Sequence, residues 1–394
     1  MKLFFFIEAR IDKLDGTYYL PDAFGENILN RYLEVFDSIY VVCRVREVNN
    51  LSRAGVSPLK NPSISVIELP IYNGLLDYIK KKRQIKRIIS QHINPNSAYI
   101  CRVPGQIGLI ATDLLNDKRI KYGVEVVGDP WDSLAPQACK HPLAPVLRII
   151  ARYELQKIVK NSTASLYVTE YVLQKRYPTK KGIFTTNASN VELSIDNIQK
   201  EKPKLNRFQK RDKYSFMSIG SLAQMYKAPD VVLNALSKVS EAGIKFHFTW
   251  FGDGKYRNSM IDLTKQLGLT ECVSFPGNVS HDEIMSALKD CDILIHASIA
   301  EGLPRAVIEA MANAVPVIGT NVGGIPELLL PDAIIRPKNV QALFDKVRMF
   351  TDNPENMLKH AIHNLKKASE FEKSLLAKRR FEFYKTVKSL NSDI

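Results

Sequence analysis

The stretch that decides the fold is Ala300-Glu301-Gly302-Leu303-Pro304-Arg305-Ala306-Val307-Ile308-Glu309-Ala310-Met311. Its glycine allows a tight turn, and its proline suits the first position of a helix, where a missing N–H costs nothing. Glu301 is therefore expected just before a helix, beside unpaired N–H groups and the positive end of the helix dipole. Glu309 is expected two turns further on, among apolar neighbours, where a carboxylate is costly to bury without a partner.

Two interpretations of these acids stay open at this point. Glu301, Arg305 and Glu309 are spaced i, i+4, i+8, as on a solvated, salt-bridged helix face. Alternatively, the acids grip a ligand with hydroxyls at both ends and phosphate between them, which is the layout of a nucleotide-sugar. The following residues favour the ligand site, because 314–319 reads as a buried strand and 321–328 as a second glycine-rich turn opening a helix. Two such turns form a phosphate cradle in an α/β sheet.

Length and composition favour a globular chain with two domains. The chain has 394 residues, of which 45% are hydrophobic and 24% charged. No apolar run approaches the roughly 20 residues that span a bilayer. The start, 1–7, meets Glu8 and Arg10 too soon for a secretory signal and is predicted to be a β-strand. The five cysteines are scattered and form no CxxC pair, which indicates reduced thiols, a cytoplasmic protein and no zinc site.

The net charge of +14 is unevenly spread. Residues 1–200 hold 28 Lys and Arg against 19 Asp and Glu (+9), and the remainder holds 27 against 22 (+5). A basic first half suits nucleic acid, anionic lipid or a phosphate-bearing substrate, but no zinc-finger, RNP-like or basic-zipper pattern is present, so nucleic acid is not expected. Residues 78–89 place six cations between apolar ends. This segment fits either a solvated helix or an interfacial helix drawn to an anionic membrane surface.

Short apolar strands alternate with helical segments along the chain, which predicts βαβ units and parallel sheets. A polar stretch at 187–213 separates an N-terminal domain, 1–195, from a C-terminal domain, 205–371. A helical segment at about 372–394 is a candidate to pack back on the first domain. In the second half the expected strands are 214–219, 245–251, 272–275 and 293–295, and the expected helices are 229–240, 256–267 and one capped by Ser280 and Glu283.

The turns after these strands share one property: each contains glycine or small residues. They lie at 220–227, 251–254, 276–279 and 297–304. Because ligands in open α/β sheets bind at the carboxyl ends of the strands, this edge is expected to carry the site, with Lys227 offering charge to a phosphate. Asp290-Cys291-Asp292 matches the letters of a metal-binding DxD, but its place between a helix end and an apolar strand favours capping. His296 fits either a pocket residue or a packed histidine.

Residues 220–227, 251–254, 275–279 and 301–328 resemble the donor-binding half of retaining GT-B glycosyltransferases of the glycosyl transferases group 1 (GT4-like) family. Glu301 and Glu309 stand as its E-x7-E motif. The resemblance implies an α/β fold of two Rossmann-like parallel-sheet domains facing across a cleft. It also implies that the first domain holds the acceptor and the second holds the nucleotide-sugar.

The resemblance assigns roles to individual residues. Glu309 is expected to bind the ribose hydroxyls, Glu301 the donor sugar, Lys227 the pyrophosphate, and Val279 with its neighbours the base. Glu301 and Lys227 are the expected catalytic residues. The expected donor-binding residues are Gly220, Ser221, Gly252, Gly254, Val279, Gly302, Leu303, Pro304, Arg305 and Glu309, and the acceptor-side candidates are Gly16, Glu125 and Asp129.

Two departures from the family pattern bear on activity. Ser221 stands where members often carry arginine for the diphosphate, and Gly128 stands where many carry histidine. Arg305 is a candidate to replace the lost charge, and Asp129 to hydrogen-bond a sugar or acceptor hydroxyl.

The expected function is retaining transfer of a hexosyl or N-acetylhexosaminyl group (EC 2.4) in cell-surface glycan synthesis. The expected donor is a UDP-sugar, with no metal and no further cofactor. The acceptor is lipid-linked or a polysaccharide, at the cytoplasmic face of the membrane, where the protein is expected to be peripheral. Two alternatives are a catalytically weakened subunit that binds nucleotide-sugar for a partner, and a GT-B-fold nucleotide-sugar epimerase.

Overall fold

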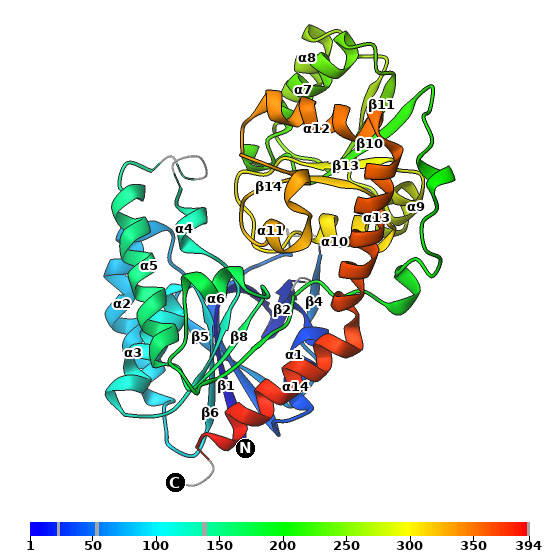
Figure 1. Ribbon diagram of the computed structural model, residues 1–394. Coiled ribbons are helices and arrows are strands. Elements are labelled where there is room, and N and C mark those ends of the chain that lie inside the picture. Colours follow the sequence, from blue (N-terminus) through cyan, green and yellow to red (C-terminus); the bar gives the residue numbers. More distant parts are fainter. Residues whose placement is uncertain (22–23, 52–54, 136–138, 140, 392–394) are drawn as a thin grey trace. The chain divides into compact units, whose positions relative to one another are not determined.

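The computed structural model describes residues 1–21, 24–51, 55–135, 139 and 141–391. The chain divides into two compact α/β units, shown in Figure 1. The first comprises Met1–Pro130, Ile149–Ala188 and Ala377–Ile394, and the second comprises Trp131–Arg148 and Ser189–Leu376. In the part of the chain described, no helix combines the length and the apolarity needed to cross a membrane.

The first unit is built on a nine-stranded sheet whose parallel strands follow the order β5-β3-β1-β6-β7-β8-β9. These strands are β1 (Lys2–Leu14), β3 (Ser38–Glu47), β5 (Ile64–Leu69), β6 (Ala98–Val103), β7 (Gly123–Val126), β8 (Ala164–Tyr167) and β9 (Phe184–Asn187). The helices of this unit are α1 (Glu26–Leu33), α2 (Gly74–Gln91), α3 (Gln106–Asp117) and α6 (Val172–Arg176). Two further helices, α5 (Ala144–Asn161) and α14 (Lys373–Ser389), begin in segments of the second unit and end in the first, and α4 (Pro130–Ser133) lies at another boundary.

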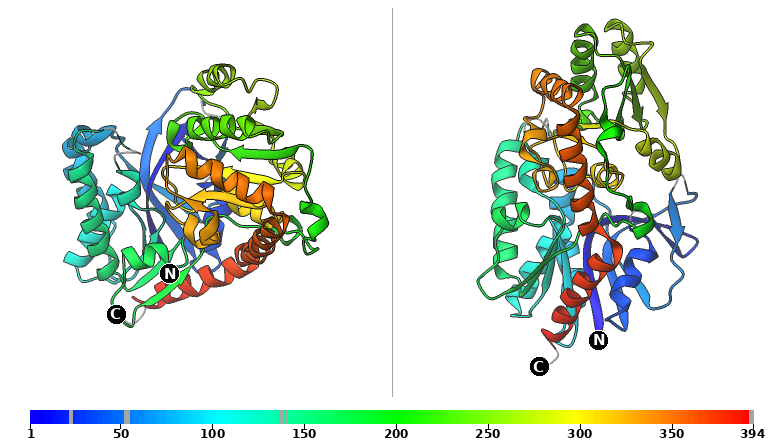
Figure 2. Two further views of the ribbon diagram at one scale, coloured as in Figure 1. Left: turned by 45° about the horizontal axis from the view of Figure 1, so that its top comes forward. Right: turned by 45° about the vertical axis from the view of Figure 1, so that its right-hand side comes forward.

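Both faces of the first sheet are covered, which explains why strands such as β7 are buried at every residue. Helices α2, α3 and α5 cover one face, where Ile85, Ile107 and Leu155 belong to one apolar core (Figure 1). Helix α14, red in Figures 1 and 2, lies along the sheet. Its Phe383 and Val387 pack so closely on Gly123 that a Cβ there would come within 2.5 Å of Val387 Cγ2.

The second unit contains a six-stranded, wholly parallel sheet in the order β12-β11-β10-β13-β14-β15. Numbered along the chain within this unit, the order is 3-2-1-4-5-6, that of a doubly wound nucleotide-binding fold. The strands are β10 (Tyr214–Ile219), β11 (Phe246–Phe251), β12 (Val273–Gly277), β13 (Ile293–His296), β14 (Val317–Thr320) and β15 (Ile334–Ile335). The helices are α7 (Pro229–Glu241), α8 (Arg257–Gln266), α9 (His281–Lys289), α10 (Arg305–Ala312), α11 (Ile325–Leu328), α12 (Val340–Asp352) and α13 (Pro354–Ala368).

Local signals in the sequence account for several of these boundaries. Ser280 and Glu283 form the predicted capping box at the start of α9. Helix α10 begins one residue later than predicted: Pro304 is its N-cap, with extended backbone, and Arg305 is its first residue. The reason for a proline here is unchanged, because the helix needs no backbone N–H at this position either.

Two strands of the first unit were not predicted. β2 (Thr17–Pro21) pairs antiparallel with the far end of β1, and β4 (Val56–Pro58) pairs antiparallel with β2. Asp15 and Gly16 form the turn between β1 and β2 with φ of 48° and 80°. An Asp-Gly pair between apolar runs is a strong hairpin signal, so the sequence contained the information.

We expect Gly123→Ala to lower the stability of the protein, because the new methyl group would collide with Val387 and with Phe383 Cζ at 3.0 Å. Overpacking of a filled core typically costs about 1–3 kcal/mol. Thermal unfolding of Gly123→Ala beside Gly128→Ala measures the effect. Gly128 is the matched control, since the nearest atom to its added Cβ is Pro104 Cδ at 3.6 Å. Equal melting temperatures for the two variants would contradict the packing of α14 on β7.

Candidate active site

The carboxyl ends of β10 and β13 mark the point where the strand order of the second unit reverses. The two strands are parallel neighbours, and the chain leaves them in opposite directions along the sheet. Ligands of open α/β sheets bind at such a switch point. The turn after β10 carries Lys227 and the turn after β13 carries Glu301. A backbone hydrogen bond from Ile299 N to Tyr226 O (2.7 Å) ties the turns together.

Lys227, Glu301 and His296 meet at this edge. Lys227 Nζ donates to Glu301 Oε1 at 2.5 Å, and His296 Nε2 lies 2.9 Å from the same oxygen. The side chains of Lys227 and Glu301 are only 14% and 10% exposed. Burial by itself would raise the pKa of Glu301, but the His296 hydrogen bond and the Lys227 charge outweigh it and lower the pKa to about 2. Glu301 is therefore a carboxylate at any physiological pH.

His296 is the last residue of β13 and is buried. Burial lowers its pKa, so the imidazole is neutral at physiological pH, although the nearby carboxylate opposes the shift. Ser298 Oγ lies 3.1 Å from the same Nε2, and the Ser298 carbonyl accepts a 2.6 Å hydrogen bond from Thr320 Oγ1 on β14. Of the two interpretations of His296, the structure therefore supports a residue of the site.

The backbones of the glycine-rich turns after β10 and β11 are in direct contact with each other. A Cβ on Gly252 would lie 2.2 Å from the Gly220 carbonyl oxygen, and one on Gly254 would lie 2.0 Å from Ala223 N, so neither turn admits a side chain. Gly220 itself lies under the aliphatic stem of Lys227, whose Cγ would be 3.1 Å from an added Cβ. The turns after β10 and β11 thus form one surface beside the lysine.

The remaining predicted donor residues border the same turns. Ser221 Oγ accepts from Ala223 N at 3.1 Å, which stabilises the turn after β10. Gly302 accepts from Gly324 N at 2.6 Å, which joins the two glycine turns predicted to form a cradle. Leu303 is partly buried against an apolar core, and Val279, half-buried, follows β12. None of these contacts assigns a ligand, so their roles stay predictions.

Glu309 is buried within α10 and has no close partner among the described residues. The nearest side-chain nitrogens are His281 Nδ1 at 3.7 Å and Arg305 NH1 at 3.9 Å, beyond hydrogen-bonding distance. Burial raises its pKa, against the opposing charges of Arg305 and His281. With side chains 10% and 6% exposed, Glu301 and Glu309 do not form the solvated helix face that i, i+4 spacing also allowed. Arg305 itself is 63% exposed.

The three acceptor-side candidates of the first unit lie in separate places. Gly16 is exposed in its hairpin turn. Glu125, on β7, accepts a 2.7 Å hydrogen bond from the Tyr32 hydroxyl. Asp129 is buried and accepts from Arg176 and from the Tyr177 hydroxyl. Both acids already hold partners within the fold, so an acceptor role stays a prediction.

Asp290 and Asp292, the two acids of the DxD-like sequence, have separate structural roles. Asp292 is buried, accepts from Ser215 N at 2.8 Å and pairs with Arg211 Nε at 3.3 Å. Asp290 is the C-cap of α9. Within the ranges that the structure describes, no three His, Cys, Asp or Glu residues gather as they would around a metal ion.

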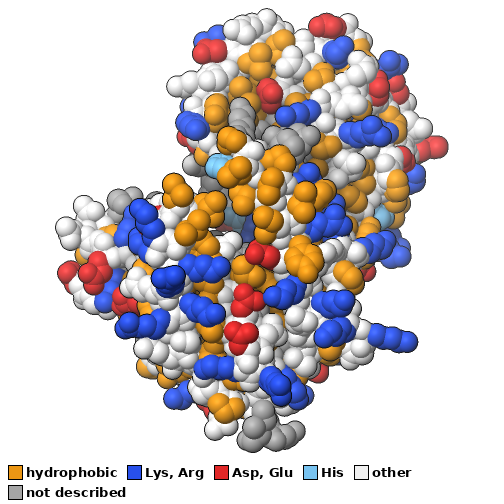
Figure 3. Space-filling model, turned by 90° about the vertical axis from the view of Figure 1, so that its left-hand side faces the viewer, with side chains coloured by type: hydrophobic (Ala, Val, Ile, Leu, Met, Phe, Trp, Pro, Cys, Tyr) orange, Lys and Arg blue, Asp and Glu red, His pale blue; other side chains and the backbone are white. Residues whose placement is uncertain are grey.

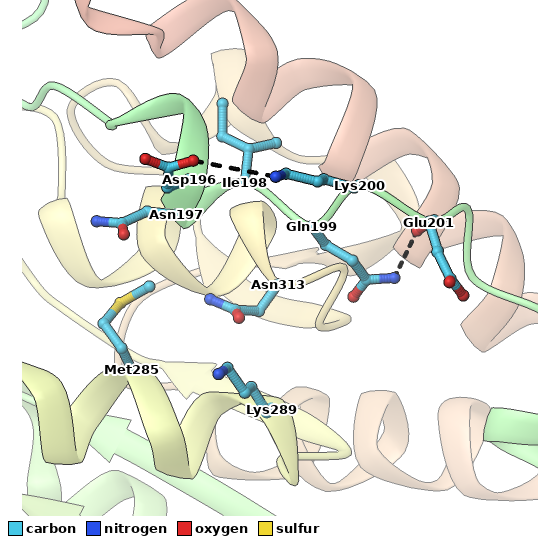
Figure 4. Close-up of a pocket in the computed structure, with 9 residues that line it drawn as sticks. All are labelled: Asp196, Asn197, Ile198, Gln199, Lys200, Glu201, Met285, Lys289 and Asn313. Atoms are coloured by element: carbon cyan, nitrogen blue, oxygen red, sulfur yellow. Dashed lines mark hydrogen bonds and ion pairs between the residues drawn. The ribbon is translucent and has the colours of Figure 1, made fainter.

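A cavity of about 500 Å³ lies elsewhere in the second unit (Figure 4). It is lined by Asp196, Asn197, Ile198, Gln199, Lys200, Glu201, Met285, Lys289 and Asn313. These residues come from the segment before β10, from α9 and from the end of α10, and none is a predicted donor residue. The volume alone therefore does not identify the site, and the charged side chains that meet at the switch point make that edge the candidate.

Comparisons with known proteins agree with this geometry. Residues 198–368 match the family model of glycosyl transferases group 1. The chain is 26% identical over 344 residues to protein CapJ of Staphylococcus aureus, covering 87% of this chain and 84% of CapJ. It is 29% identical over 134 residues to the putative colanic acid biosynthesis glycosyltransferase WcaL of Escherichia coli K12, covering 32% of this chain and 33% of WcaL.

Among solved structures, HepE of Anabaena in complex with UDP superposes with a TM-score of 0.62. The match covers 97% of this chain and 99% of HepE at 14% identity, and at that identity it shows the fold. The predicted α/β GT-B architecture of two parallel-sheet domains is confirmed. The match over residues 198–368 and the similarity to CapJ support a group 1 glycosyltransferase, and the fold is that of GT-B glycosyltransferases.

Proposed function

We propose that the protein transfers a hexosyl or N-acetylhexosaminyl group from a UDP-sugar, with retention and without a metal ion. The proposed acceptor is a lipid-linked sugar or a polysaccharide in cell-surface glycan synthesis. The observation that carries the proposal is the meeting of Lys227 and the ionised Glu301 at the switch point of the second sheet. Two relatives support it: HepE is described with UDP and, in another crystal, with UDP-glucose, and WcaL is described as acting in colanic acid biosynthesis.

In the proposed reaction the bond between the anomeric carbon and the diphosphate oxygen breaks. The acceptor hydroxyl oxygen bonds to the same carbon and passes its proton to the departing diphosphate, which leaves with the electron pair of the broken bond. Preorganised donors at that charge supply the largest catalytic contribution in many enzymes. Lys227 supplies an ammonium at this edge, and it is fixed by Glu301 on one side and by Gly220 beneath its stem.

The two acids suit hydroxyl-bearing parts of the donor. A carboxylate only accepts hydrogen bonds, and a sugar hydroxyl donates one. Glu301 is assigned to the donor sugar because it lies beside Lys227. Glu309 is assigned to the ribose because it is buried in the second turn of α10 and has no close partner there. A ligand hydroxyl there would supply the hydrogen bond that the protein does not.

We expect Lys227→Ala and Glu301→Gln each to lower turnover of the donor by roughly 10²-fold, the effect of losing one preorganised charge partner. Released nucleoside diphosphate would be measured over a panel of UDP-, GDP- and ADP-sugars, with and without membrane-extracted lipid-linked glycans, in buffer and in excess EDTA. Product stereochemistry would be read by NMR. Lys238→Ala, which removes an exposed lysine from α7 of the same unit, is the matched control.

The same assay separates the alternatives. Turnover that needs the acceptor supports transfer, turnover of donor to its epimer without acceptor supports an epimerase, and binding without turnover supports a partner subunit. Loss of transfer in EDTA, restored by Mn²⁺ or Mg²⁺, would overturn the metal-free mechanism. Unchanged turnover in both variants would overturn the assigned site.

We expect Glu309→Gln to weaken donor binding and yet to raise the melting temperature at pH 7. Because burial raises the pKa of Glu309 in the folded protein, its ionisation costs stability above that pKa and costs nothing below the unfolded value of 4.5. The increase in melting temperature of Glu309→Gln over the wild type should therefore shrink as the pH falls toward 4.5. Thermal unfolding at both pH values and calorimetry with UDP would test this, with the exposed Glu271→Gln as control. A melting temperature lowered at pH 7 would show that Glu309 is a packing element.

We also propose that the first unit binds an anionic membrane surface, as the cations of 78–89 suggested. Large hydrophobic side chains are exposed on α2 and α5, with Leu76 77%, Ile79 57%, Ile149 62% and Tyr153 68% exposed. Figure 3 shows this face, where orange side chains are bordered by blue ones. The two helices are neighbours, because Glu154 on α5 interacts with Lys82 on α2.

Apolar and basic residues are arranged in the same order on both helices. Each helix leads from the carboxyl edge of a parallel sheet back to its amino edge. On α2 the exposed Leu76 and Ile79 precede Arg83 and Arg87, and on α5 the exposed apolar residues precede Lys157 and Lys160. The apolar part thus lies toward the ligand-binding edge of the sheet, where a lipid-linked acceptor would be presented.

We expect binding to phosphatidylglycerol vesicles at low salt, with each surface cation contributing on the order of 1 kcal/mol. Lys80→Glu, Arg83→Glu and Arg87→Glu combined should abolish it. Lys81 is left in place because it pairs with Asp77 and the Ile71 carbonyl. Flotation with vesicles measures binding, and Lys202→Glu, Lys204→Glu and Lys210→Glu combined, in the second unit, is a control of equal charge change. Equal binding to phosphatidylcholine vesicles, or none at low salt, would contradict the proposal.

A further inference from the structure

We propose that His296 is a positioning residue of the donor site, whose Nε2–H fixes the carboxylate of Glu301 against Lys227. The consequence for turnover rests on the proposed function, whereas the positioning itself does not. The inference comes from the way in which two side chains, Lys227 and His296, contact the same oxygen atom, Glu301 Oε1.

The tautomer of His296 follows from what faces its Nε2 nitrogen. Glu301 is ionised and can only accept hydrogen bonds. A lone pair on Nε2 would face a carboxylate oxygen 2.9 Å away and repel it. Nε2 therefore carries the hydrogen and donates it to Glu301 Oε1, and the neutral ring keeps its lone pair on Nδ1.

Because both donors bind one oxygen of the Glu301 carboxylate, the other oxygen is available to a ligand. Lys227 Nζ and His296 Nε2 both donate to Oε1, at 2.5 and 2.9 Å. Within the contacts described, Oε2 has no hydrogen-bond partner. His296 thus fixes the rotation of the carboxyl group so that one oxygen pairs with the lysine and the second can accept a hydrogen bond from a ligand hydroxyl.

The histidine is itself held by the sheet. It ends a strand, is only 3% exposed, and lies beside Ser298, whose carbonyl accepts from Thr320 Oγ1 on the next strand. Glu301, by contrast, lies in the turn five residues later and has no place in a strand or helix. A donor fixed at the end of a strand thus holds an acceptor that lies in a turn, and such supporting hydrogen bonds preorganise a site.

The first test measures the positioning directly, by NMR. In the wild type, ¹⁵N spectra of His296 should show a neutral ring protonated at Nε2 at pH 7, and the Glu301 ¹³C carboxyl signal should not titrate between pH 7 and 4. In His296→Leu the titration of Glu301 should move upward into that range, while His296→Gln, whose amide N–H replaces Nε2–H, should behave as the wild type. Assignment comes from loss of the signal in Glu301→Gln.

A ring protonated at Nδ1 alone in the wild type would overturn the proposal, as would a Glu301 titration that His296→Leu leaves unchanged. The tautomer is measured on the wild type, so the proposal remains testable even where the leucine variant does not fold.

The second test links positioning to turnover. With UDP-glucose as probe, His296→Leu should lower kcat about 10- to 100-fold, as for loss of a hydrogen bond to a charged group, and should leave UDP affinity within about twofold. His296→Gln should restore most of kcat. A parallel loss of UDP affinity, or no rescue by glutamine, would indicate a merely structural histidine. Turnover unaffected by Lys227→Ala and Glu301→Gln would instead count against the proposed function, and the NMR result would still stand.

Discussion

The carboxylate of Glu301 is the feature on which the rest of the second unit depends. A buried carboxylate is tolerated only when it is paired and hydrogen-bonded. Here its partners come from two different strands: Lys227 from the turn after β10, and His296 from the end of β13. The pairing therefore requires β10 and β13 to be neighbours, which holds in a 3-2-1-4-5-6 sheet and fails if the chain simply adds strands in sequence order.

The glycines of the neighbouring turns follow from the same requirement. For Lys227 to reach Glu301, its stem crosses Gly220, and the turn at Gly252–Gly254 must lie directly on the backbone of 220–223. Side chains at these positions would push the turns apart by more than the ion pair could span. The lack of side chains leaves backbone N–H groups beside the Lys227 ammonium at the switch point, and a phosphate group binds to such a surface.

The sequence predicted the second unit well because its signals are local. The Ser280–Glu283 capping box, the strand at Tyr214–Ile219 and the turn before α10 each lie within a few residues. The pairing of Lys227 with Glu301, 74 residues apart, was not predicted, because the sequence indicated only that the two turns lie at the same edge of the sheet. The role of His296 could not be predicted, since a strand-end histidine looks the same whether it packs or positions. In the first unit the pairing of Asp129 with Arg176, which comes from a distant helix, could not be predicted either.

The pKa values of the two acids of the E-x7-E motif shift in opposite directions, although both side chains are buried. Glu301 is paired with Lys227 and His296, so its pKa falls, and the site around it is formed before any ligand arrives. Burial raises the pKa of Glu309, whose nearest described side-chain nitrogens lie 3.7 and 3.9 Å away, so the folded protein bears the cost of its charge. A residue retained at such a cost is expected where a ligand supplies the missing hydrogen bonds. Binding energy at Glu309 would then come from relieving an unfavourable charge, whereas Glu301 needs no ligand to stay ionised and can hold a sugar in one orientation.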